Sequence, residues 1–132
     1  MLLLAFDTAT PSIGVAVHDG EKVVGQAHGE GAMAHGELLA PAIKSAMAAA
    51  GRTMAELTDV AVGVGPGPFT GLRVGVVTAL TLGQTLGLRT HGVCTLDTLA
   101  AEAADQVGTD FVAAIDARRK EVYWARYDDS GK

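Results

Sequence analysis

The sequence has little cysteine and little positive charge. Its one cysteine, Cys94, excludes an internal disulfide and fits a reducing compartment. Ten basic residues against fifteen acidic ones give a net charge of −5, the opposite of the balance expected for a protein that grips nucleic acid by itself. Hydrophobic residues make up 48% of the 132, which excludes a disordered chain and predicts one domain with a real core.

Leader and membrane signals are also missing. The apolar start, residues 1–7, is short and lacks a basic residue, so it predicts a first strand and a cytoplasmic protein rather than a signal peptide. Residues 74–88 carry no formal charge. However, Arg73, Gln84 and several threonines in or beside this stretch oppose insertion into a membrane.

Motifs for metal binding and nucleophilic catalysis are absent as well. The four histidines form neither H-x-x-x-H nor H-E-x-x-H, and Cys94 stands alone. No serine lies in a G-x-S-x-G elbow. The sequence therefore predicts no catalytic residue and no metal site.

The pattern that is present predicts an α/β fold. Alternating and continuous apolar runs indicate the order βββ-α-β-α-β-α followed by two further strands. The predicted strands are residues 2–6, 13–17, 22–28, 59–64, 90–93, 110–115 and 121–127, and the predicted helices are residues 37–50, 72–88 and 95–104. Because the end of the chain repeats an opening hairpin, we expect a first lobe over residues 1–108 and a truncated second lobe over 109–132.

A turn rich in glycine and proline, residues 65–68, organises the chain. A P-loop would end in Gly-Lys-Ser/Thr, whereas Gly71-Leu72-Arg73 stands here, and two prolines remove N–H donors that a phosphate would need. The favoured interpretation is a rigid turn followed directly by a helix, with Thr70 as the N-cap of that helix.

The helix after this turn has a small residue at every fourth position. The row consists of Gly71, Gly75, Ala79, Gly83 and Gly87. An interior glycine costs a helix about 1 kcal/mol relative to alanine, so the row predicts close approach of another helix. That helix is either residues 37–50 of the same chain or part of a partner. We favour the partner, with an interface formed by this row and by His35, Leu39, Ile43 and Arg73.

Four segments together carry a family resemblance. They are Leu4-Ala-Phe-Asp-Thr-Ala-Thr-Pro11, His35-Gly-Glu-Leu-Leu-Ala-Pro41, Gly65-Pro-Gly-Pro-Phe-Thr-Gly-Leu-Arg-Val-Gly75 and Asp116-Ala-Arg-Arg-Lys-Glu-Val-Tyr-Trp124. In this order they resemble the TsaB (YeaZ) family, a subunit in biosynthesis of threonylcarbamoyladenosine in tRNA, which older labels place among M22 glycoproteases. Pro68 stands where the family commonly has serine, and Lys120 where it often has glycine.

The resemblance implies an actin-like, Hsp70-like ATPase-type lobe, with a mixed sheet flanked by helices and the start of a second, similar lobe. It implies a non-catalytic scaffold that pairs with a TsaD-type enzyme through helices of the first lobe, while a TsaE-type ATPase joins the complex. The modified residue is the adenosine next to the anticodon, and tRNA is expected to be met only through the complex. In isolation we expect a homodimer.

The same resemblance places Asp7, Thr8 and Asp116 at a vestigial nucleotide site that binds ATP or ADP with Mg²⁺ weakly. From the residues alone, Asp7 has another interpretation, because an aspartate can cap a turn by bonding to its own backbone two residues on. The basic run at residues 118–120 either touches tRNA phosphate or is a solvated turn. A small-molecule kinase that uses ATP and shares the fold is the alternative function.

Overall fold

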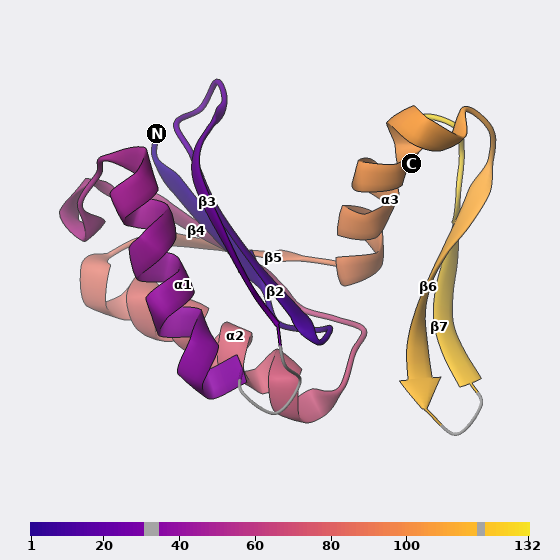
Figure 1. The fold of residues 1–132 in the computed structure, drawn as a ribbon, viewed down its shortest axis with the longest axis horizontal. Coiled ribbons are helices and arrows are strands. Elements are labelled where there is room, and N and C mark those ends of the chain that lie inside the picture. Colours follow the sequence, from indigo (N-terminus) through magenta and orange to yellow (C-terminus); the bar gives the residue numbers. More distant parts are fainter. Residues whose placement is uncertain (31–34, 119–120) are drawn as a thin grey trace.

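The computed structural model describes residues 1–30, 35–118 and 121–132, and it confirms the predicted element order (Figure 1). Every predicted strand and helix is present, and one 3-10 turn is added. The elements are β1 (Leu3–Asp7), β2 (Ser12–His18), β3 (Val23–Glu30), α1 (His35–Ala50), the 3-10 turn (Met54–Glu56), β4 (Asp59–Gly63), α2 (Phe69–Leu86), β5 (Arg89–Val93), α3 (Thr95–Val107), β6 (Phe111–Arg118) and β7 (Glu121–Tyr127).

Five strands form a mixed sheet in the order β3-β2-β1-β4-β5. β2 runs antiparallel to β1 and β3, whereas β4 runs parallel to β1 and β5. The two parallel connections pass through α1 and α2, which lie on the same face of the sheet (Figure 1). β6 and β7 form a separate antiparallel hairpin.

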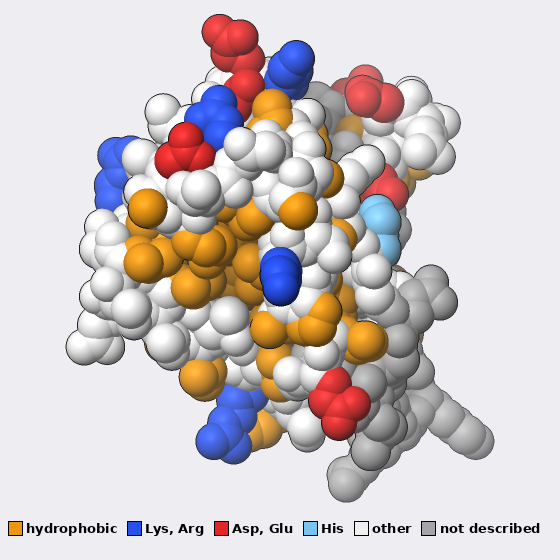
Figure 2. Space-filling view, turned by 60° about the vertical axis from the view of Figure 1, so that its left-hand side comes forward, with side chains coloured by type: hydrophobic (Ala, Val, Ile, Leu, Met, Phe, Trp, Pro, Cys, Tyr) orange, Lys and Arg blue, Asp and Glu red, His pale blue; other side chains and the backbone are white. Residues whose placement is uncertain are grey.

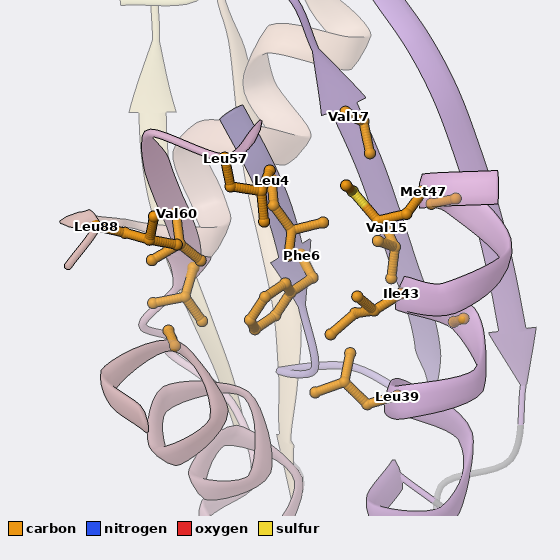
Figure 3. Close-up of a cluster of buried hydrophobic side chains, with 14 of the residues drawn as sticks. Leu4, Phe6, Val15, Val17, Leu39, Ile43, Met47, Leu57, Val60 and Leu88 are labelled. Carbon is orange, nitrogen blue, oxygen red and sulfur yellow. The ribbon is translucent and has the colours of Figure 1, made fainter. Parts of the chain in front are cut away.

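The main core lies between the sheet and these two helices. Alternate strand residues such as Leu4, Phe6 and Val15 point to one side, because side chains of a strand alternate between its faces. Leu39 and Ile43 of α1 point toward them from the helix (Figure 3). Burying each such side chain stabilises the fold by about 1.5–3 kcal/mol.

A second cluster joins α3 to the hairpin. Leu96 and Ala100 of α3 pack on Ile115 and Tyr127, and the Tyr127 hydroxyl donates to Asp97 Oδ1 at 2.6 Å. Burial of the ring, together with this hydrogen bond, raises the pKa of Tyr127 to about 12. In this cluster α3 packs on the hairpin that follows residue 108, and the expected lobe boundary at that residue stays a prediction.

Two local predictions need correction. α2 begins at Phe69 with Pro68 as its N-cap and no capping side chain, so Thr70 is already a helical residue. α1 begins at His35, earlier than predicted, which puts Pro41 inside the helix in its second turn.

Asp59 anchors the edge strand β5 to β4. This buried carboxylate accepts a hydrogen bond from Thr58 Oγ1 at 2.6 Å, contacts Nη2 of Arg89 at 3.0 Å and contacts Nε2 of His91 at 2.8 Å. The bond from Thr58, followed by that from His91, lowers the pKa of Asp59 to about 2. The ionised form is therefore favoured in the folded state.

We predict that Asp59→Asn lowers stability at pH 7 and weakens its dependence on acid. The folded pKa of about 2 lies below the unfolded value of about 3.9. The contribution of Asp59 is therefore complete above pH 4 and is lost as the pH falls from about 4 to about 2. Urea unfolding at pH 7, 4 and 3 measures this, with Asp105→Asn on the exposed side of α3 as the control. Equal acid dependence in wild type and Asp59→Asn would contradict the prediction.

Candidate functional site

The carboxylate of Asp7 sits where β1 ends. Its Oδ1 accepts the backbone N–H of Ala9 at 2.7 Å, and its Oδ2 accepts the hydroxyl of Thr95 at 2.9 Å. The carboxylate lies directly against Gly63, where a Cβ would collide with it. The turn-capping interpretation of Asp7 is thus confirmed by the bond to Ala9.

Thr8, the second residue expected at a nucleotide site, is fully buried. Its hydroxyl donates to the carbonyl of Gly71 at 2.6 Å and accepts the N–H of Gly75 at 3.0 Å. Thr8 therefore ties the end of β1 to the first half of α2, instead of facing a ligand.

These residues fit a magnesium nucleotide poorly. Both oxygens of Asp7 are engaged inside the chain, and the hydroxyl of Thr8 is enclosed. Asp116 lies in β6 opposite Val122. The side chains of Asp116 and His35 lie outside the description, and so does most of the basic run at residues 118–120. The pairing of Asp7 with Asp116 stays a prediction.

The described residues hold neither a metal-binding cluster nor a membrane-spanning helix. In residues 1–30, 35–118 and 121–132, no group of three or more histidine, cysteine, aspartate or glutamate side chains is arranged to hold a metal ion. None of the helices within these ranges is long and apolar enough to cross a membrane.

The small-residue row of α2 faces the chain's own sheet. Gly71, Gly75 and Ala79 are buried, and a Cβ at position 75 would meet Thr8 Oγ1 at 2.6 Å and Val62 at 3.4 Å. At Gly83 the corresponding neighbour is Thr90 of β5. The close approach predicted for this row is real, but the approaching element is a sheet and not another helix.

The other predicted interface residues divide between core, helix end and surface. Leu39 and Ile43 are buried in the main core. Gly87 ends α2 in the left-handed conformation with φ +66°, and its N–H bonds to the carbonyl of Gly83. Of the predicted interface residues whose burial is described, Arg73 and Gly87 are exposed.

Large apolar side chains are exposed on the outward side of α2. Phe69 is 75% exposed, Leu80 is 58% exposed, and Val77 lies between them in sequence, on the same side as Arg73. Two hollows follow this side and share Thr78. One, of about 470 Å³, is lined by Phe69, Thr70, Arg73, Val74, Val77 and Thr78.

The second hollow, of about 530 Å³, is a groove between α1 and α2. Its floor is formed by apolar side chains of α1, α2 and the 3-10 turn, including Met47, Met54 and Leu82, and two basic residues, Lys44 and Arg52, also line it. Figure 2 shows hydrophobic side chains gathered in a hollow on the side of the molecule that carries these helices. We call the two hollows with Phe69, Val77 and Leu80 the helical face.

Comparison with known proteins identifies the family. A sequence profile described as TsaD: tRNA N6-adenosine threonylcarbamoyltransferase matches residues 29–132. The Escherichia coli protein named tRNA threonylcarbamoyladenosine biosynthesis protein TsaB is 38% identical over 135 residues. The chain belongs to the TsaB (YeaZ) family of TsaD-like proteins.

Further matches support this assignment. An uncharacterised protein of Mycobacterium tuberculosis is 46% identical over 129 residues, which covers 96% of this chain and 59% of that protein. The solved structure of YeaZ from Pseudomonas aeruginosa matches with a TM-score of 0.89 and 32% identity, covering 96% of this chain and 60% of that one. The E. coli protein is matched over 58% of its length, so the TsaB-family chain spans about three fifths of these relatives.

More distant matches show the fold alone. An ROK hexokinase from Thermus thermophilus matches with a TM-score of 0.53 and 22% identity. The ethanolamine utilization protein EutJ from Carboxydothermus hydrogenoformans matches with a TM-score of 0.54 and 15% identity. Together with YeaZ they confirm the actin-like ATPase fold that the resemblance implied for the TsaB-family chain.

Sequence reasoning missed several residues that shape the surroundings of Asp7 and the helical face. Thr95 and Gly63 shape the surroundings of Asp7, although they lie far from it along the chain. Val77 and Leu80 could have been found, because they lie on the helix side opposite the glycine row, where a surface helix normally carries polar residues.

We predict that Gly75→Ala destabilises the TsaB-family chain by about 1–3 kcal/mol, because the new methyl group crowds the buried Thr8 hydroxyl against the helix. The matched control is Gly36→Ala in α1, where a Cβ meets nothing within 4 Å. It should gain up to about 1 kcal/mol from helix propensity. Urea unfolding of both variants checks the contrast. A gain of stability in both would show that the Thr8 contact yields easily.

Proposed function

We propose that this chain is a non-catalytic scaffold subunit that pairs with a TsaD-type enzyme, which carries out threonylcarbamoyl modification of the adenosine next to the anticodon in tRNA. Family membership and the names of relatives from E. coli and Bacillus subtilis support this role. The observation that carries the proposal is the exposed apolar side of α2, which is unusual for a surface helix.

The helical face has the composition of a docking surface. Phe69, Val77 and Leu80 are large apolar side chains of α2, and each exposes more than half of its surface. Arg73 lies among them, and Lys44 and Arg52 line the adjoining groove. Aromatic residues and arginine, here Phe69 and Arg73, are enriched in protein interfaces relative to the rest of the surface. A helix pair of the TsaD-type partner fits this face, and a second copy takes its place when that partner is absent.

The remaining parts of the complex follow from this arrangement. A TsaE-type ATPase joins the pair, and the chain meets tRNA only as a member of the complex. The net charge of −5 supports this indirect role, since independent tRNA binding favours the opposite sign. Nucleotide bound by this chain, ATP or ADP with Mg²⁺, is weakly held, because Asp7 already uses both oxygens internally.

The hairpin is the opening of a second lobe. Val112, Val122 and Trp124 are exposed on strands β6 and β7. A two-stranded sheet is marginally stable in water by itself. Further strands and helices, for which the longer relatives have room, would cover this apolar surface.

We predict that Val77→Gln combined with Leu80→Gln weakens binding to the TsaD-type subunit at least about tenfold, since burying a valine or leucine side chain contributes about 1.5–3 kcal/mol and a factor of ten corresponds to about 1.4 kcal/mol. Titration calorimetry with the full-length proteins measures the dissociation constant. The matched control is Val107→Gln, an exposed apolar position of α3 away from the helical face.

Unchanged affinity of the double variant would remove the helical face from the interface. No binding of the wild-type chain to the TsaD-type subunit at micromolar concentration would overturn the proposed scaffold role itself.

A further inference from the structure

Thr95 lies at the junction of the two hydrophobic clusters. It is the first residue of α3 and is 3% exposed. Its N–H donates to the carbonyl of Gly65 at 2.8 Å, and its hydroxyl accepts the N–H of Gly65 at 3.1 Å. The same hydroxyl donates to Asp7 Oδ2 at 2.9 Å. One side chain thus binds the ends of β1 and β4 to the start of α3.

The covalent path at this junction is short. β5 ends at Val93 and α3 begins at Thr95, so Cys94 alone separates them. The carbonyl of Val93 accepts the N–H of Val64, which fixes the end of β5 beside β4. A change of backbone angle at Cys94 would swing α3, and with it the hairpin that packs on α3, relative to the five-stranded sheet.

We propose that Thr95 is a positioning residue, and that its hydrogen bonds to Asp7 and Gly65 set the orientation of the unit formed by α3, β6 and β7 relative to the five-stranded sheet. A hydroxyl has one proton to donate and accepts at its oxygen, so Thr95 uses both capacities at once. The Asp7 carboxylate can reach this bond because Gly63 leaves room for it.

The arrangement couples the surroundings of Asp7 to the second cluster. Any cation or hydrogen-bond donor that takes Oδ2 of Asp7 competes directly with the Thr95 hydroxyl. Displacing that hydroxyl loosens the start of α3 without disturbing the bond from Ala9 to Oδ1. Asp7 is therefore a point at which the relative orientation of the two units can be regulated, independently of whether a TsaD-type partner binds.

The test uses Trp124, the one tryptophan in the sequence, as a fluorescence donor on the hairpin. An acceptor is attached to cysteine at Glu21→Cys, in the exposed turn between β2 and β3, in a full-length chain that carries Cys94→Ala and in which any cysteine or tryptophan outside residues 1–132 is replaced. Time-resolved energy transfer gives the distribution of distances between the two units. Thr95→Val, which keeps the shape and loses the hydroxyl, should broaden this distribution. Thr95→Ser, which keeps the hydroxyl, should leave it as in the parent.

Hydrogen exchange provides the local readout. In Thr95→Val the amide of Gly65 loses its acceptor and should exchange about tenfold faster, as expected for one lost buried hydrogen bond. Amides of α1 should keep their rates, which separates release of α3 from a general loss of stability. Thr98→Val, in the first turn of the same helix, is the matched control.

Asp7→Ala supplies a second test if Thr95→Val does not fold. It removes the oxygen that accepts the Thr95 hydroxyl, together with the oxygen that accepts the Ala9 N–H, and offers no polar group in their place. The distance distribution should then broaden while exchange at Gly65 stays slow. The proposal is overturned if the variants that fold show the same distance distribution as Thr95→Ser.

Discussion

The fold depends on the close contact between α2 and the sheet beneath it. Along this contact the helix presents backbone in place of side chains, at Gly71 and Gly75, so that the buried hydroxyl of Thr8 reaches two of its peptide groups. The same contact determines which side of α2 is exposed. The glycine-lined side of α2 faces the sheet, and Phe69, Val77 and Leu80 are exposed on its other side. The interface proposed for these residues therefore lies on the side of α2 opposite its contact with the sheet.

Two neighbouring residues at the end of β1 form hydrogen bonds that hold two different helices. Thr8 bonds to α2, and Asp7 bonds through Thr95 to α3. In an ATPase of this fold, an aspartate at this position would be expected near phosphates and metal. Here both oxygens of its carboxylate are engaged in hydrogen bonds within the chain.

The sequence predicted the order of the strands and helices, but not which elements pack against one another. The order of strands and helices followed from apolar periodicity, whereas α2 ends at Leu86, two residues before the predicted end, with the left-handed Gly87 as its C-cap. The four-residue spacing from Gly71 to Gly83 showed that one side of the helix is thin. It could not show whether a sheet or a helix covers that side, because both accept a row of small residues.

The bond between Asp7 and Thr95 could not be predicted from the sequence either, because it joins residues that are far apart along the chain. The Ala9 bond is local, two residues away, and was foreseen as an alternative. Thr95 lies 88 residues from Asp7, and only the parallel pairing of β1, β4 and β5 brings it close. Amphipathic spacing likewise identified the buried side of α3 and not the surface that buries it, which here is the hairpin of β6 and β7.

The anchoring of β5 has a consequence for solubility. β5 is the last strand of its sheet, all five of its residues are exposed, and its outer backbone groups are open to any strand from another molecule. Arg89 and His91, both tied to Asp59, place bulky polar groups along this margin. Such groups oppose edge-to-edge stacking of sheets, the first step toward fibrous aggregates. The carboxylate that fastens the strand thus also helps to keep the protein dispersed.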